Sequence, residues 1–160
     1  MKKNNMGFTL IELLIVIAII SILTTMAMPS FMDRTIKAQV AEALILSEMA
    51  KKEVENYYRV KGKMPEDNKK AGLPNADKII GNYVKSIQID KGAINIKLGN
   101  RINRYAEGKI ITLRPAIVKN YKKVPIAWVC GYASTPEGMT IVSKNSSDIM
   151  ERHLPVNCRY

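Results

Sequence analysis

The apolar run at residues 8–28 constrains this chain more than any other feature. It contains 21 residues and a single charge, Glu12, near its start. A helix needs about 20 such residues to cross a bilayer. A lone carboxylate in hydrocarbon costs about 2.5 kcal/mol or more, so Glu12 predicts a partner that arrives after insertion into the membrane. The alternative, an isolated transmembrane anchor, leaves Glu12 without a role.

The segment before the run is short, with seven residues, and it is basic. Lys2 and Lys3 favour a cytoplasmic location for this end. A secretory signal peptide has a shorter apolar core, followed by a small-residue cleavage site. Here the small residue, Gly7, precedes the run instead. Cleavage there would leave the whole apolar helix on the mature chain, so we expect a leader at residues 1–7 and a single-pass membrane segment after it.

Helical periodicity resumes directly after Pro29, so we expect one helix from residue 8 to about residue 58, about 75 Å long and bent at the proline. The alternative is that the helix stops at Met28. A second, weaker apolar strip contains Ala41, Ile45 and Met49, and we expect it to pack on neighbouring molecules. The main apolar face, which we expect to pack on the protein's own sheet, contains Ile36, Val40, Ala43, Ser47, Ala50, Val54 and Tyr57.

Residues 59–160 are expected to form a globular head. Turn-forming residues predict a loop over 59–82, with a short helical turn near 76–80. Strands are predicted at residues 83–89, 93–98, 109–118 and 125–130, the first two joined as a hairpin through Asp90-Lys91-Gly92. The predicted fold class is α+β, with the long helix packed on a four-stranded antiparallel sheet. The predicted organisation is thus 1–7 leader, 8–28 membrane-spanning half of the helix, 29–58 amphipathic half and 59–160 head.

Two cysteines, Cys130 and Cys158, lie near the end of the chain. An even count in a chain with an export-type N-terminus predicts one disulfide in an oxidising compartment. Such a bridge would close a loop over 131–157 and would stabilise the head by about 3–4 kcal/mol in the chain-entropy model. Two free buried thiols are the alternative.

The formal net charge is +11, and it is unevenly distributed. Residues 91–130 carry a net charge of +8, with Glu107 as their one acidic residue. Such a stretch favours anionic partners such as DNA, lipid headgroups or acidic polysaccharide. A solvated basic face that aids solubility is the alternative. The basic residues are Lys91, Lys97, Arg101, Arg104, Lys109, Arg114, Lys119, Lys122 and Lys123.

Residues 7–12, Gly-Phe-Thr-Leu-Ile-Glu, followed by an apolar run, resemble the class III signal of type IV pilins and related pseudopilins. The resemblance implies that a membrane aspartyl peptidase, the prepilin peptidase, cuts after Gly7 and that Phe8 becomes the N-methylated first mature residue. It implies that Glu12 pairs with the N-terminal amine of a neighbouring subunit. That pairing would set the axial register, because misaligned subunits leave a buried charge unpaired. In this family a proline at the position of Pro29 marks a bend in the helix.

Residues 126–131 and 153–159 resemble the two ends of the disulfide-bounded loop of type IVa pilins, so the resemblance covers nearly the whole chain. It implies a structural subunit of a type IVa pilus, held in the bacterial inner membrane before assembly and located in the extracellular pilus afterwards. The implied partners are other subunits, the prepilin peptidase and the inner-membrane assembly machinery. The implied roles are adhesion to a host surface, twitching motility and DNA uptake.

Two other classes of protein carry the same kind of leader sequence. A minor competence pilin would bind DNA through the basic stretch, with an affinity that falls as salt rises. A type II secretion pseudopilin is the other alternative, although its family typically uses a calcium site in place of a C-terminal disulfide.

The sequence contains no motif of a catalytic or cofactor-binding site. It contains no glycine-rich phosphate-binding motif. The single histidine, His153, predicts a surface or packing residue, and the pair Glu66-Asp67 predicts solvated loop charges. We therefore expect no catalytic residue, cofactor or metal. Asn145-Ser146-Ser147 matches an N-glycosylation acceptor, but a plain turn is the preferred interpretation.

Overall fold

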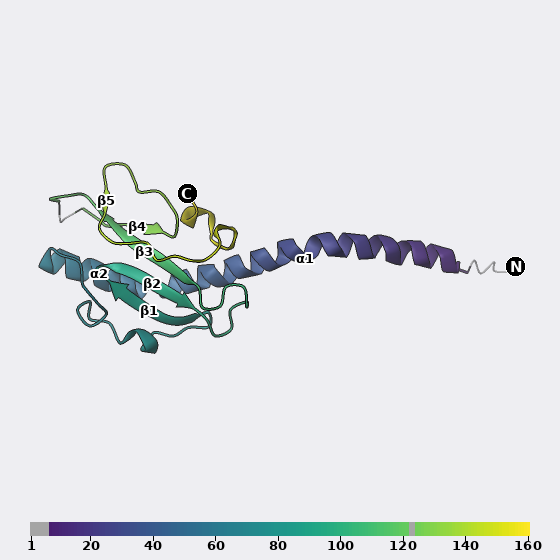
Figure 1. Cartoon of the computed structure of the whole chain (residues 1–160), viewed down its shortest axis with the longest axis horizontal. Coiled ribbons are helices and arrows are strands. Elements are labelled where there is room, and N and C mark those ends of the chain that lie inside the picture. Colours follow the sequence, from purple (N-terminus) through teal and green to yellow (C-terminus); the bar gives the residue numbers. More distant parts are fainter. Residues whose placement is uncertain (1–6, 122–123) are drawn as a thin grey trace, which may run out of the picture. The chain divides into compact units, whose positions relative to one another are not determined.

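The long N-terminal helix is present. The computed structural model describes residues 7–121 and 124–160, with side chains described outside residues 27–30. Its contacts divide the chain into two compact units, Met1–Arg34 and Thr35–Tyr160. Helix α1 (Leu10–Leu46) begins in the first unit and ends in the second, where α2 (Glu48–Lys61) follows it (Figure 1). This helical segment, Leu10–Lys61, includes a window with a mean hydropathy of 2.6 and is long and apolar enough to cross a membrane.

The helix is irregular at Ser47, which separates α1 from α2. The Ser47 hydroxyl donates to the Leu44 carbonyl oxygen at 2.6 Å, and the Ser47 backbone N–H donates to the same oxygen at 3.1 Å. A serine hydroxyl that binds a carbonyl one turn back competes with the normal helical bond and tightens the turn. The predicted long helix is therefore present as α1 and α2 with one irregular residue between them, and it ends at Lys61, three residues beyond the predicted end near residue 58.

The buried face of the helix agrees with the prediction except at its end. Tyr58 is buried there, whereas Tyr57 is half-buried. Tyr58 follows Val54 by four residues and so continues the same stripe. Gly62 ends α2 in a left-handed conformation with φ +68°, and its N–H donates to the Tyr58 carbonyl oxygen at 2.8 Å.

The four predicted strands are all present in one antiparallel sheet. Their order across the sheet is β1-β2-β3-β4. A two-residue strand, β5 (Thr140–Ile141), also pairs with β3 and was not predicted, because two residues are too few to show a period. The four longer strands are β1 (Val84–Asp90), β2 (Ala93–Leu98), β3 (Ile110–Ile117) and β4 (Ala127–Cys130).

The first two strands form the predicted hairpin. Asp90 is paired with Ala93, which leaves Lys91 and Gly92 as the two central residues of the turn. Both have positive φ, +49° and +86°. Two positive φ values give a turn whose twist matches that of the flanking strands, and glycine at the second position adopts this conformation freely.

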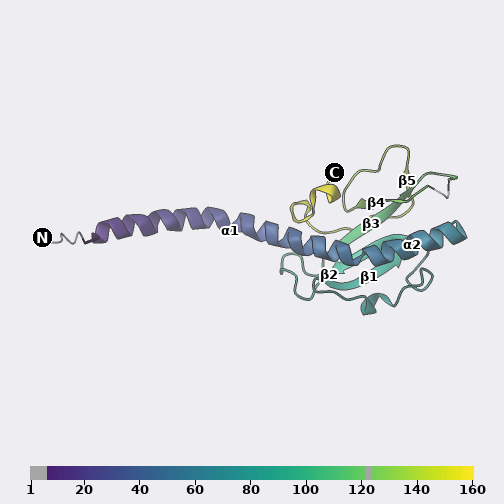
Figure 2. The same ribbon diagram turned by 180° about the vertical axis from the view of Figure 1, so that it is seen from behind.

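One core joins the helices to the sheet within the unit Thr35–Tyr160. Figures 1 and 2 show α2 and the end of α1 on one face of the sheet. Isoleucines of β1 and β2 are buried against that helical face. The connection from α2 to β1 contains a short 3-10 helix, Ala76–Lys78, at the position predicted for a helical turn. The α+β fold class is therefore confirmed.

Candidate assembly site

The predicted cleavage bond lies just before the helix begins. Gly7 and Phe8 precede the first helical residue, Leu10, and both are exposed. A side chain built on Gly7 would meet no atom within 4 Å. The bond between Gly7 and Phe8 therefore lies outside the helix, and no other described residue covers it. Lys2 and Lys3 lie outside the described residues.

Thr9 and Glu12 form a reciprocal cap at the start of α1. The Glu12 carboxylate accepts hydrogen bonds from the Thr9 backbone N–H at 2.9 Å and from the Thr9 hydroxyl at 2.6 Å. In return, the Glu12 backbone N–H donates to the Thr9 hydroxyl oxygen at 3.3 Å. This is a capping box, whose signature is Thr-x-x-Glu at the start of an apolar run. Thr9 and Glu12 show this signature in the sequence, although no cap was predicted there.

Glu12 is exposed within its own chain, as are the apolar side chains around it. The large hydrophobic residues between Phe8 and Met26 are all at least 43% exposed, so this segment contributes nothing to the core of the chain. Three hydroxyl groups along it donate to carbonyl oxygens of the same helix, so their hydrogen bonds are satisfied without another chain. These are Ser21 to Ile17, Thr24 to Ile20 and Thr25 to Ile22, each at 2.7 Å.

The predicted bend position, Pro29, lies inside the bounds of α1, so the helix does not stop at Met28. A proline inside a helix removes one backbone donor. Its side chain is not among those described.

The two cysteines are joined as predicted. The disulfide Cys130–Cys158 connects the end of β4 to a short 3-10 helix, Val156–Cys158. Gly131 follows Cys130 with φ +57°, and a Cβ there would lie 2.7 Å from the Cys158 carbonyl oxygen. The residue after the first cysteine must therefore be small and left-handed to let the C-terminal segment approach.

Arg114, one of the predicted basic residues, is directed into the protein. Its guanidinium donates to the carbonyl oxygens of Gly131 at 3.1 Å and Ala133 at 3.2 Å. Burial lowers the pKa of this guanidinium from its ordinary value. Arg114 thus holds the start of the disulfide-bounded loop against β3.

The other basic residues lie at two ends of the sheet. At one end, Lys91 lies in the β1–β2 turn. Lys119 lies at the same end, because it comes just after the last residue of β3. Lys122 and Lys123 lie outside the described residues. Lys109 contacts Asp148 at 3.6 Å, and Arg104 lies over the Tyr105 ring at 5.0 Å. The residues at the opposite end, around the β2–β3 connection, are Lys97, Arg101, Arg104 and Lys109.

Asn145 forms a turn. Its side-chain nitrogen donates to the Gly131 carbonyl oxygen at 2.8 Å, and its side-chain oxygen accepts from the Ser147 backbone N–H at 3.1 Å. An asparagine that bonds two residues onward forms an Asx turn. This geometry agrees with the preferred interpretation of the Asn-Ser-Ser sequence.

Comparison with known proteins agrees with this geometry. Residues 36–159 match the family model described as Pilin (bacterial filament), and residues 2–28 match the prokaryotic N-terminal methylation motif. The chain is 38% identical to a type IV major pilin protein PilE1 of Neisseria gonorrhoeae over 99% of its own length and 96% of the relative's. It is 35% identical to a fimbrial protein of Neisseria meningitidis serogroup B over the same shares, and 42% identical to the fimbrial protein EcpC of Eikenella corrodens over 59% and 61% of the two chains. The chain belongs to the pilin family of bacterial filament proteins.

Proposed function

We propose that this chain is a structural subunit of a type IVa pilus, assembled through its apolar helix. The observation that carries the proposal is the exposed segment between Phe8 and Met26, with Glu12 as its single charged residue. A helix that is apolar on all sides must be covered by lipid or by other helices. Membrane lipid covers it before assembly, and other subunits cover it in the filament.

During assembly, the Glu12 carboxylate exchanges one binding partner for another. In the precursor, the carboxylate is occupied by the Thr9 cap. Cleavage after Gly7 by the prepilin peptidase creates a new amine at Phe8, which is then N-methylated. In the filament, the amine of one subunit pairs with Glu12 of the next, so that each charge is compensated by the other within an apolar core. The inner-membrane assembly machinery supplies the energy, and the subunit itself has a structural role without catalysis.

The test compares Glu12→Gln with Ser21→Ala in the same helix. Glutamine keeps the size of Glu12 and removes its charge, whereas the Ser21 hydroxyl donates to the Ile17 carbonyl oxygen of its own helix. We expect Glu12→Gln to reduce the subunit recovered in sheared surface filaments at least tenfold, with normal levels in the membrane. Ser21→Ala should assemble as the wild type does. Equal filament yields for all three chains would refute the proposal.

A second candidate function is binding of DNA by the head. It is favoured by exposed Arg101 and Arg104 near one end of the sheet, with Arg104 over the Tyr105 ring. Cations beside an aromatic ring suit a phosphate backbone with stacked bases. Filter binding of assembled filaments to DNA at two salt concentrations tests this function. Affinity that falls steeply with salt supports it, and absent or salt-independent binding excludes it.

A type II secretion pseudopilin is less well supported. The three relatives described above are named as pilin or fimbrial proteins. The head also contains the disulfide that favoured a pilin in the sequence analysis.

A further inference from the structure

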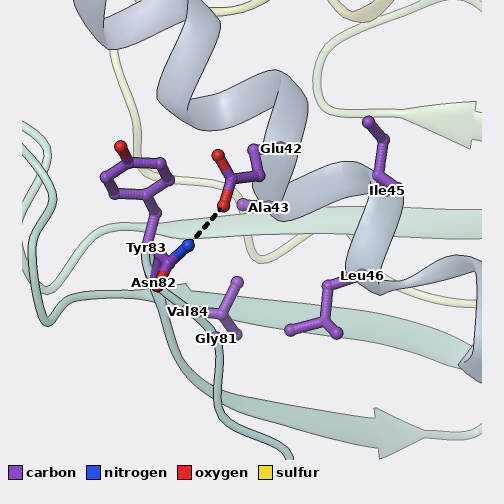
Figure 3. A pocket seen from close by; sticks show the side chains of 8 residues that line it. All are labelled: Glu42, Ala43, Ile45, Leu46, Gly81, Asn82, Tyr83 and Val84. Atoms are coloured by element: carbon purple, nitrogen blue, oxygen red, sulfur yellow. Dashed lines mark hydrogen bonds between the residues drawn. The ribbon is translucent and has the colours of Figure 1, made fainter.

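A hollow of about 360 Å³ opens between the end of α1 and the residues before β1 (Figure 3). Its apolar lining includes Ala43, Leu46 and Val84. Figure 3 shows Glu42, Asn82 and Tyr83 toward one side and Leu46 toward the other. The site therefore combines an apolar floor with an aromatic ring and one carboxylate.

The wall of the hollow is held in place by hydrogen bonds. The Asn100 side-chain nitrogen donates to the carbonyl oxygens of Gly81 and Val84, each at 2.9 Å. The Gly81 backbone N–H also donates to the Val84 carbonyl oxygen at 3.0 Å. A Cβ on Gly81 would lie 2.7 Å from a methyl group of Leu46, so glycine allows this close approach to α1. The hollow is pre-formed.

The side chain of Glu42 lines the hollow and is exposed. It accepts a hydrogen bond from the Asn82 side-chain nitrogen at 2.9 Å. Among the residues that the structure describes, no lysine or arginine nitrogen forms an ion pair with it. Acidic groups are scarce in this chain, which has 14 of them against 25 lysines and arginines. An exposed carboxylate on such a surface attracts the cationic side chains of any further copy.

We propose that this hollow receives a lysine or arginine side chain of a second copy of the chain, an inference that rests on the proposed filament function. The aliphatic stem of such a side chain covers Leu46 and Val84, because lysine and arginine bury their stems and keep the charged end in a polar place. The charged end meets Glu42 beside the Tyr83 ring, which also attracts cations. Copies that each keep a side-chain net charge of +9 once Lys2 and Lys3 leave with the leader (11 less 2) repel one another, and this contact offsets part of that repulsion at the head.

The test uses the full chain in a piliated cell that lacks its own major subunit. Glu42→Gln removes the charge, and Glu42→Lys reverses it. Glu107→Lys is the matched control, because Glu107 is also exposed and the change in net charge is the same, but it does not line the hollow. We expect filament yield to fall several-fold for Glu42→Gln and at least tenfold for Glu42→Lys. Glu107→Lys should stay within twofold of the wild type.

Three results would overturn the inference. One is a yield for Glu42→Lys equal to that of Glu107→Lys. Another is a loss of filaments matched by a lower melting temperature of the membrane-extracted subunit, which would make the Glu42–Asn82 bond merely structural. A third is that the Glu42 variants form normal filaments but no longer bind a foreign molecule. That molecule, and not a second copy of the chain, would then be the occupant of the hollow. If even the wild-type chain forms no filaments, the proposed function itself fails, and that outcome is separate from these three.

Discussion

The side-chain oxygen of Asn68 accepts a hydrogen bond of 2.7 Å from the backbone N–H of Ile89 in β1. The Asn68 side-chain nitrogen donates to the carbonyl oxygens of Ile87 at 2.9 Å and Pro74 at 3.0 Å. This buried amide takes the place of a neighbouring strand along the outer edge of β1. It satisfies backbone groups that would otherwise be left free at an edge of the sheet.

Replacing Asn68 by alanine should destabilise the head by about 2–4 kcal/mol, because buried backbone groups of β1 lose their partners. Chemical denaturation of the full chain in detergent measures the difference. Asn56→Ala, an exposed position on α2, is the control and should change stability by less than about 0.5 kcal/mol. A small effect for Asn68→Ala would mean that water replaces the amide.

Removing the Thr9 hydroxyl should weaken the start of α1, because the Glu12 backbone N–H loses its acceptor and the Glu12 carboxylate keeps only the bond from the Thr9 backbone N–H. Thr9→Ala loses the reciprocal cap, which is worth about 1 kcal/mol of helix stability. We expect fewer filaments from Thr9→Ala and nearly normal yield from Thr9→Ser, which keeps the hydroxyl. The measurement is the ratio of subunit in sheared filaments to subunit in membranes. Equal yields from the two variants would contradict a role for the cap.

Gly131→Ala should destabilise the head by about 2–4 kcal/mol, because the new methyl group meets the Cys158 carbonyl oxygen in a left-handed conformation. Gly108→Ala is a matched control with φ +73° and open space around it. It should cost only the conformational penalty of about 1–2 kcal/mol. Thermal melts of the two variants separate the contact with Cys158 from backbone strain. Equal melting temperatures would show that the C-terminal segment moves aside.

Reducing the Cys130–Cys158 disulfide should lower the stability of the head by about 3–4 kcal/mol, since the bridge restricts the unfolded chain over residues 131–157. Denaturation with and without a reductant measures the loss. A double variant, Cys130→Ser with Cys158→Ser, should be as unstable as the reduced chain and should not respond to reductant. A response in the double variant would place the effect elsewhere.

Stability should also fall in strong alkali through Tyr132. Burial raises the pKa of the Tyr132 hydroxyl, and the nearby charges of Asp148 and Glu151 raise it further. The folded state therefore holds this proton more tightly than the unfolded chain does. The resulting contribution is fully present below the ordinary tyrosine pKa of about 10, and it is lost as pH rises through the higher folded pKa.

Tyr132→Phe provides the check on this pH dependence. The Tyr132 hydroxyl donates to the carbonyl oxygen of Ile149 at 2.9 Å, so the variant that lacks this hydroxyl should be less stable at neutral pH. Its loss of stability above pH 10 should nevertheless be shallower than that of the wild type. Denaturation curves measured between neutral pH and strong alkali give both quantities, and parallel curves would assign the alkaline loss to other groups.

Local patterns in the sequence were sufficient for much of the fold. An apolar run, a helical stripe and a Lys-Gly turn each predict structure within one element or between neighbours. The strands 93–98 and the β1–β2 turn agree with the prediction for this reason. The Thr9–Glu12 cap belongs to the same class, since both residues lie within one turn. The cysteine pair could be predicted across 28 positions because the sequence has only two cysteines. The roles proposed for Gly7, Phe8, Glu12 and Pro29 in processing and assembly stay predictions.

Tertiary structure decided the features that depend on groups far apart in the chain. In the sequence, Asn68 resembles any polar loop residue. The fold brings it into contact with Ile89, which lies 21 residues further along the chain. Arg114 belongs to a basic stretch in the sequence, yet β3 directs its guanidinium to carbonyl oxygens of the disulfide-bounded loop. The hollow beside Glu42 likewise exists only because Gly81 lets a distant segment approach α1. Periodicity reports which face of an element is buried, but the partner on that face depends on how the chain closes on itself.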